Sequence, residues 1–119
     1  MGNRAVIEFK DYDLGIYFHW NGGRDSIESF LKIARVLKLE FNIDGFSKFS
    51  ELFSKFPVSA NGVKLQPLKF LDLDNYDNGV YVVYNWEIID RKFKRNKEQF
   101  HIDQDEMFQH LLELYKIDF

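Results

Sequence analysis

Apolar and polar residues alternate along two short segments near the start of the chain. The first runs from Ala5 to Lys10 and the second from Ile16 to Trp20, and both carry an apolar residue at every second position. This period is typical of a β-strand with one buried face. Residues 11–15, which contain two Asp and a Gly, favour a turn between them. We therefore expect an antiparallel hairpin.

Helical spacing replaces this alternation after an Asn-Gly-Gly tripeptide, whose residues accept positive φ and so end the second strand. Asp25 and Glu28 resemble a capping box, in which a carboxylate accepts hydrogen bonds from the free amides of the first turn. A helix is predicted to begin at Asp25 or Ser26 and to end near Leu37 or Leu39. Its apolar face consists of Ile27, Phe30, Leu31 and Ala34.

Two more helices are predicted further along the chain. One follows Asp44 and Gly45 and is ended by Pro57, because proline cannot continue a helix. Its apolar face consists of Phe46, Phe49, Leu52, Phe53 and Phe56. The other is opened by Asp103 and Glu106 as a second capping box. Its apolar face consists of Met107, Phe108, Leu111, Leu112 and Tyr115.

Between these two helices the pattern predicts a meander of strands. Val63–Gln66 is expected to be an edge strand, because Pro67 has no amide to donate to a neighbour. Val80–Tyr84 is a strong β run, and Asn85 marks a turn or bulge. Two further strands are predicted, from Trp86 to about Lys94 and at Glu98–Ile102.

The order strand–strand–helix–helix–strand–strand–strand–helix lacks the regular alternation of a doubly wound sheet. It predicts an α+β fold, with a single, mainly antiparallel sheet and helices packed on one face, in one domain over residues 1–119. Aromatic residues make up 18% of the chain. The Phe-rich helix faces would cover the sheet. We expect Tyr17, Tyr81 and Tyr84 to line the opposite face, where exposed rings would form a protein-binding patch.

Composition narrows the classes of function. Sixteen basic and nineteen acidic residues give a net charge of −3, so the chain lacks the basic surplus of a duplex-DNA binder. The absence of Cys excludes disulfides, thiolate metal sites and cysteine nucleophiles. No apolar run reaches the roughly 18 residues of a membrane span, and no signal peptide is recognised. We expect a cytoplasmic protein without a cofactor or a membrane partner, and nucleic acid is disfavoured as a partner.

The strand-to-helix turn from His19 to Asp25 is the first candidate site. Its backbone amides and the Arg24 guanidinium would suit an anion, and His19 is a candidate general base. However, Asp25 would occupy the same amides, and the segment matches no phosphate-binding motif. We favour a structural turn, with a partner contact through His19, Trp20, Asn21 and Arg24 as the alternative, and we assign no catalytic residue.

The segment Asp-Leu-Asp-Asn-Tyr-Asp-Asn-Gly at residues 72–79 is the second candidate. The carboxylates of Asp72, Asp74 and Asp77 would suit a hard cation such as Ca²⁺ or Mg²⁺. Gly79 nevertheless falls two positions late for an EF-hand loop, and Val83 stands where the closing glutamate belongs. The same composition is typical of a hairpin turn. We favour the turn and assign no metal site.

Residues 91–97 form the basic cluster of the chain. Its cations are Arg91, Lys92, Lys94 and Arg95, with Lys97 at the end. Basic residues beside an aromatic ring would suit single-stranded nucleic acid. Strand alternation, however, sends neighbouring cations to opposite faces, and a lysine-rich edge also protects a sheet from aggregation. We favour a solvated hairpin.

Four stretches resemble a family of small proteins from Gram-positive and related bacteria, their phages and mobile elements. They are GNRAVI at 2–7, GIYFHWNGGRDS at 15–26, LDLDNYDNGVY at 71–81 and WEI at 86–88. The resemblance covers about half of the chain, and residues 39–66 depart from it. The family has no established activity, so no functional residue transfers. The resemblance implies a cytosolic accessory protein from a mobile element, in which residues 19–24 and 72–79 lie close together and form one surface.

Three functions stay open on these grounds. The favoured one is non-enzymatic binding or modulation of a protein partner through the surface formed by residues 19–24 and 72–79. The second is a small-ligand or divalent-metal site at the same place, with hydrolysis as one version, in which the three aspartates hold a cation and Arg24 holds an anion. The third is single-stranded nucleic-acid binding through residues 91–97. The oligomeric state is left open, including a homo-oligomer.

Overall fold

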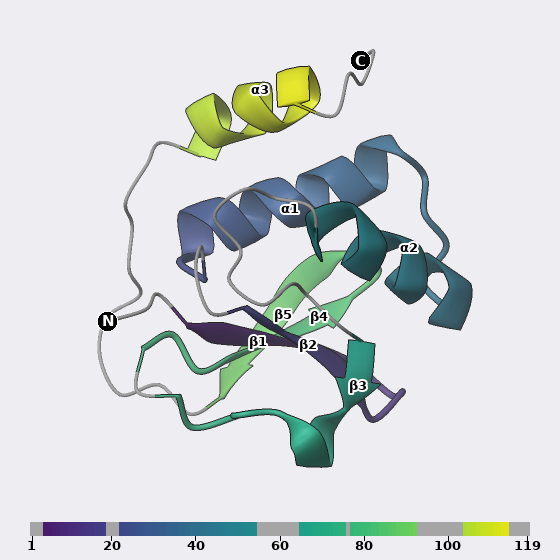
Figure 1. Cartoon of the computed structure of the whole chain (residues 1–119), viewed down its shortest axis with the longest axis vertical. Coiled ribbons are helices and arrows are strands. Elements are labelled where there is room, and N and C mark those ends of the chain that lie inside the picture. The colour runs from purple at the N-terminus through teal and green to yellow at the C-terminus, as the bar shows by residue number, and fades with distance from the viewer. Residues whose placement is uncertain (1–3, 19–21, 55–64, 76, 93–103, 115–119) are drawn as a thin grey trace.

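Five strands and three helices form a layered structure in the computed structural model, which describes residues 4–18, 22–54, 65–75, 77–92 and 104–114. The strands make one sheet, α1 and α2 cover one of its faces, and α3 lies on the outer side of α1 (Figure 1). The strands are β1 (Ala5–Phe9), β2 (Leu14–Phe18), β3 (Leu65–Pro67), β4 (Val80–Tyr84) and β5 (Glu87–Lys92). The helices are α1 (Arg24–Val36), α2 (Ile43–Ser54) and α3 (Gln104–Leu114), with a short 3₁₀ helix η1 (Leu68–Phe70).

The sheet is mixed and has the strand order β3-β2-β1-β4-β5. β1 and β2 form the expected antiparallel hairpin, whereas β1 and β4 run parallel. The α+β class and the single sheet are confirmed. The meander is wrong, because β3 pairs with β2 rather than with β4. The element order also differs, since η1 stands between β3 and β4.

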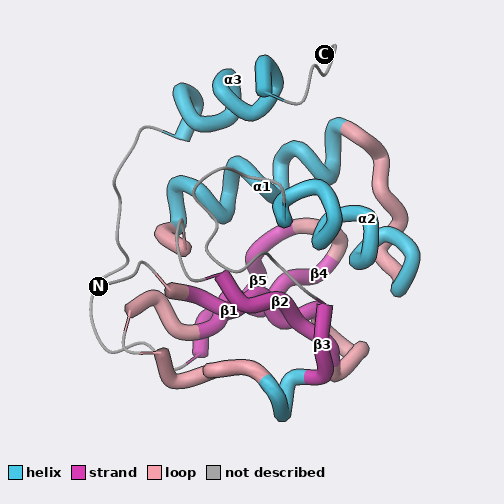
Figure 2. Tube along the Cα trace, in the orientation of Figure 1, coloured by secondary structure: helices cyan, strands magenta, loops and turns pink. Residues whose placement is uncertain are grey.

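The parallel pairing requires the chain to cross the sheet, and the connection of residues 68–79 does so. It passes along the face opposite the helices (Figure 2). There Leu71 and Leu73 pack with Tyr17 against a small cluster of buried valines, Val6, Val80 and Val82. Gly15 permits the close approach, because a Cβ at this position would lie 2.8 Å from Leu68 Cδ2 and 3.0 Å from Leu71 Cδ1.

The main core lies between the sheet and the helices and is built from aromatic rings. Phe9 of β1 stacks on Phe46 of α2 with ring centroids 3.9 Å apart, and Trp86 meets both rings edge to face. The predicted helix faces are confirmed for Phe46, Phe49 and Phe53, which are fully buried. Tyr81 belongs to this core and not to the opposite face, so its predicted position is wrong. As a result its hydroxyl must find a partner inside the protein.

The helix ends differ from the predicted capping boxes. α1 begins at Arg24 and has Gly23 as its N-cap, so Asp25 lies in the first turn and is only 2% exposed. Gly23 has φ −68°, and Gly22 is not among the residues with positive φ, so the conformational reason given for this tripeptide fails at both glycines. α2 begins at Ile43, because Asn42 caps it through a bond from the Gly45 amide to Asn42 Oδ1 at 3.0 Å.

The tight turn between β4 and β5 is made by Asn85 and Trp86, which confirms Asn85 as a turn residue. A register shift also interrupts the β4–β5 pairing between Val82 and Val83. The predictions for Phe56, Pro57, Val63, Asp103 and Glu98–Ile102 lie outside the described residues.

Candidate functional site

The two ends of the sheet differ in their chemistry. We call the end where β1 begins and β2 finishes the glycine end; it holds Arg4, Gly22, residues 77–79 and Arg91. We call the other end, where β1 and β4 finish, the aromatic end; its exposed rings are Tyr12, Phe41 and Tyr84. The sequence directs attention to the glycine end, so its geometry comes first.

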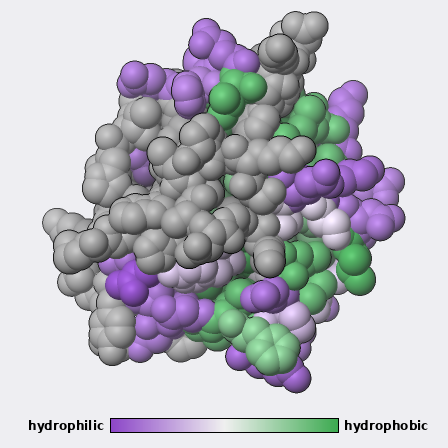
Figure 3. Space-filling view, in the orientation of Figure 1, coloured by the Kyte–Doolittle hydropathy of each residue, from purple (hydrophilic) through white to green (hydrophobic). Residues whose placement is uncertain are grey.

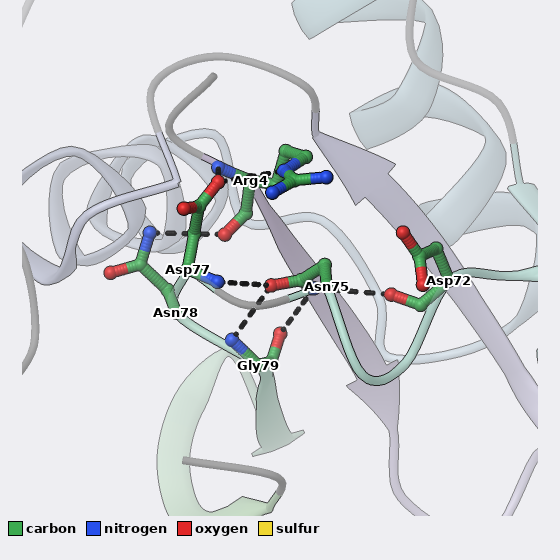
Figure 4. A network of polar contacts seen from close by, with 6 residues as sticks. All are labelled: Arg4, Asp72, Asn75, Asp77, Asn78 and Gly79. Carbon is green, nitrogen blue, oxygen red and sulfur yellow. Dashed lines mark hydrogen bonds and ion pairs between the residues drawn. The ribbon is translucent and has the colours of Figure 1, made fainter. Parts of the chain in front are cut away.

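Arg4 and Asp77 form an ion pair that joins the start of β1 to the connection before β4. Arg4 Nε lies 2.7 Å from Asp77 Oδ2, and the Arg4 backbone amide donates to the same oxygen at 2.9 Å (Figure 4). This hydrogen bond to Asp77 raises the pKa of the Arg4 guanidinium above its ordinary value. The Asp77 carboxylate is therefore already committed to contacts within the protein.

Asn75 organises the rest of this connection from the inside. Its side chain is fully buried, and its amide nitrogen donates to the carbonyl oxygens of Asp72 and Gly79 at 3.1 and 3.2 Å. Its amide oxygen accepts from the backbone amides of Asp77 and Gly79 at 3.2 and 3.1 Å. All four bonds run within the loop, so they use the hydrogen-bonding capacity of the side chain. The favoured structural interpretation of residues 72–79 agrees with this geometry.

Asn78 fastens the same loop to β1. Its backbone amide and its side-chain amide both donate to the Arg4 carbonyl oxygen at 3.0 Å. Gly79 then takes a φ of 69°, which glycine adopts at no steric cost. The chain thereby turns directly into β4.

Tyr81 and Arg91 connect this loop to the start of α1. The Tyr81 hydroxyl donates to the Gly22 carbonyl oxygen at 2.9 Å. The Arg91 guanidinium lies 3.9 Å from the centre of the Tyr81 ring and donates to the Asn78 carbonyl oxygen. These contacts bring Gly22 and Asn78 to the same end of the sheet, as the resemblance implies for their segments.

The remaining predicted site residues are distributed as follows. Arg24 forms an ion pair with Glu28 at 3.5 Å, and Lys92 forms one with Glu8 at 3.2 Å on the opposite face of the sheet from Arg91. Asp72 and Asp74 are exposed. His19, Trp20, Asn21, Lys94 and Arg95 lie outside the described residues. Among the residues that are described, no three acidic or histidine side chains are grouped to hold a metal ion.

The aromatic end exposes rings that the core does not cover. Tyr12 is 37% and Tyr84 45% exposed, and both meet the half-buried Phe41 edge to face, with ring centroids 5.9 and 5.5 Å away. The Tyr12 hydroxyl donates to the Phe41 carbonyl oxygen at 3.0 Å, which fixes the β1–β2 turn against the connection between α1 and α2. Leu37 and Ile43 extend this exposed surface, at 39% and 57% exposure. Figure 3 shows hydrophobic residues reaching the surface on the side of α2 and β3.

Backbone strain is concentrated at the aromatic end. All five non-glycine residues with positive φ in the described part of the chain lie in its turns: Asp11, Asp13, Lys38, Asn85 and Trp86. Asp and Asn tolerate this conformation, but Lys and Trp do so at a cost. Trp86 is compensated by burial among aromatic rings and by a bond from its Nε1 to the Leu39 carbonyl oxygen at 2.9 Å. Strain of this kind gathers at functional sites.

A cavity of about 400 Å³ lies beside these rings, where α1 ends and α2 begins. Lys38, Glu40, Asp44 and Lys48 supply four of its seven lining residues, and Leu37, Leu39 and Gly45 complete it. Gly45 is required there, because a Cβ would lie 1.7 Å from the Glu40 carbonyl oxygen. The cavity and the exposed rings therefore share one surface, since Phe41 follows directly after its lining residues.

Sequence reasoning missed this surface for a physical reason. Phe41 lies between two predicted helices, and Tyr12 lies in a predicted turn, so neither belongs to a periodic pattern. The signal that was present is the position of large aromatic residues in polar turns, where burial would not be expected. The carboxyl ends of parallel strands, here β1 and β4, are also where open sheets commonly bind ligands.

Comparison with known protein families, with curated proteins and with solved structures finds no significant match to this chain. The resemblance to small bacterial and phage proteins stays a prediction. In the part of the chain that is described, no helix combines the length and the hydropathy that a membrane span needs.

Proposed function

We propose that the protein is a non-enzymatic binding module that holds a segment of another polypeptide on its aromatic end. The observation that carries this proposal is the continuous exposed surface of Tyr12, Phe41 and Tyr84, extended by Leu37 and Ile43. Tyrosine supplies a large contact area with few rotatable bonds, and aromatic residues are enriched where proteins bind one another. Apolar patches of this kind on a folded domain commonly mark interaction sites.

The same function at the glycine end, which the sequence favours, receives less support. Arg24 and Asp77 are both in ion pairs within the protein. A partner that used these charges would have to replace those contacts, and exchanging one partly buried pair for another yields little net affinity. At the aromatic end a partner would cover apolar surface that is in contact with water, which is favourable.

Panning a random dodecapeptide display library against the immobilised protein tests the proposal. We expect enrichment of peptides that the Tyr84→Ser/Ile43→Ser double variant binds at least tenfold more weakly. The Phe70→Ser variant is the matched control, because Phe70 is 68% exposed on η1, away from the aromatic end. The melting temperature of each variant shows that the fold is retained, since all three side chains are exposed.

Two outcomes would contradict this function. One is the absence of any enriched peptide. The other is binding that survives in the double variant but is lost in the Phe70→Ser control, which would locate the interaction surface on η1 instead.

A further inference from the structure

The cavity beside the exposed rings contains two lysines whose charges are not neutralised by the protein. Within the described part of the chain, neither Lys38 nor Lys48 takes part in an ion pair. By contrast Arg4, Arg24 and Lys92 all contact a carboxylate. The aromatic end therefore carries cationic groups that stay available to a partner.

Two acidic residues line the same cavity and must be weighed against the lysines. The Glu40 carboxylate accepts a bond from the Asn42 side-chain amide at 2.8 Å. Asp44 lies in the first turn of α2, where the helix dipole favours a negative charge. It precedes Lys48 by four residues, the spacing of a helical ion pair, yet no such pair forms between them. Both carboxylates are thus accommodated locally, whereas the two ammonium groups are not.

Lys38 also occupies a backbone position that favours another residue. It has φ 56° and follows the C-cap of α1, where Lys38 N donates to the Arg35 carbonyl and Leu39 N donates to the Ala34 carbonyl. This is a Schellman arrangement, and glycine is the usual residue at its left-handed position. A lysine there costs stability and supplies a cation to the cavity.

We propose that the cavity receives an acidic side chain of the bound polypeptide, held between Lys38 and Lys48, while a neighbouring apolar side chain covers Tyr84 and Ile43. The ligand is therefore a segment with Asp or Glu a few residues from a large apolar residue. This inference rests on the proposed function, because it names the chemistry of the segment that the aromatic end binds. Charge complementarity selects this occupant over a neutral or basic one.

Fluorescence anisotropy with defined peptides tests the proposal on the full chain. The probes share one labelled scaffold with a central Phe and carry Glu, Gln or Lys two residues away. We expect the Glu peptide to bind about tenfold more tightly than the Gln peptide at low salt, with the advantage reduced in 300 mM NaCl because the charges are screened. The Lys peptide should bind most weakly.

Variants of the two lysines sharpen the result. Lys38→Gln with Lys48→Gln should abolish the preference for Glu over Gln, whereas Lys69→Gln on η1 should leave it unchanged. Lys38→Gly should raise the melting temperature and weaken binding of the Glu peptide. This opposite response separates a ligand contact from a general loss of folding.

The outcomes distinguish the inference from the function beneath it. If the Glu and Gln peptides bind equally well and both need Tyr84 and Ile43, the inference is wrong and the binding module stands. If no peptide depends on Tyr84 and Ile43, the proposed function fails first. Tighter binding of a labelled single-stranded oligonucleotide than of the Glu peptide, lost in the double lysine variant, would also overturn the inference.

Discussion

The glycine end and the aromatic end use similar residues for opposite purposes. At the glycine end Asn75, Asp77 and Arg91 spend their hydrogen bonds on the protein itself, and the loop they hold is closed to further partners. At the aromatic end the rings of Tyr12 and Tyr84 are exposed, and Lys38 carries an unneutralised charge. A conspicuous polar motif can therefore mark the place where a fold is fastened, while binding capacity lies where charges and rings are left over.

Asn75→Ala should break the glycine end most severely. It removes four hydrogen bonds and leaves buried backbone groups without partners, so we expect a loss of about 3 kcal/mol in the free energy of unfolding. Urea denaturation measures this, with the exposed Asp72→Asn as the control that should change stability by less than about 0.5 kcal/mol. Equal stability of the two variants would mean that the loop does not depend on its central amide.

Tyr81→Phe should weaken the link between the loop and α1 more mildly. The ring and its stacking with Arg91 remain, but the Gly22 carbonyl loses its donor, which costs about 1 kcal/mol. Hydrogen exchange should show faster opening of the first turn of α1 than in the wild type. Faster exchange confined to α2 would contradict the assigned role of the hydroxyl.

Lys38→Gly should act in the other direction, at the aromatic end. Glycine accepts the left-handed conformation at this position, so we expect a gain of about 0.5 to 1 kcal/mol in the free energy of unfolding. Urea denaturation of this variant and of Lys48→Gly provides the contrast, because Lys48 lies inside α2, where glycine costs about 1 kcal/mol. A loss of stability in both variants would refute the strain at Lys38.

Tyr17 gives the smallest effect and depends on pH. Burial of the phenol raises the pKa of Tyr17, with the nearby Arg4 acting against this shift. The folded state therefore holds the proton more tightly than the unfolded state, and the contribution to stability is present below the ordinary pKa of about 10 and lost as pH rises through the raised value. Between pH 9 and 11 the urea midpoint should fall more steeply for the wild type than for Tyr17→Phe, and parallel slopes would argue against this shift.

Local patterns predicted the individual elements better than their arrangement. Strict alternation at Ala5–Phe9 and Val80–Tyr84 identified both strands, and helical spacing identified the buried face of α2. The parallel pairing of β1 with β4 was not accessible, because alternation carries no information on which strand lies beside which. The crossing of residues 68–79 was hidden as well, since Leu71 and Leu73 are interrupted by aspartates and resemble a solvated turn.

The candidate site was predicted at the wrong level of organisation. Gly22 and residues 77–79 do converge, but the geometry that joins them consists of bonds internal to the fold. The aromatic end depends on contacts between Tyr12, Phe41 and Tyr84, which come from three separate connections and strands. Such a surface exists only after the sheet has formed, so no single stretch of sequence contains it.

The position of β1 at the centre of the sheet has a consequence for biosynthesis. Its partner β2 follows within a few residues, but its other partner, β4, emerges from the ribosome only after more than half of the chain has been made. During that interval one edge of β1 has no native neighbour, and unpaired strand edges are what nascent chains aggregate through. Slow translation between η1 and β4 would prolong this vulnerable period, so productive yield in the cell should depend on how quickly the second half of the polypeptide is delivered.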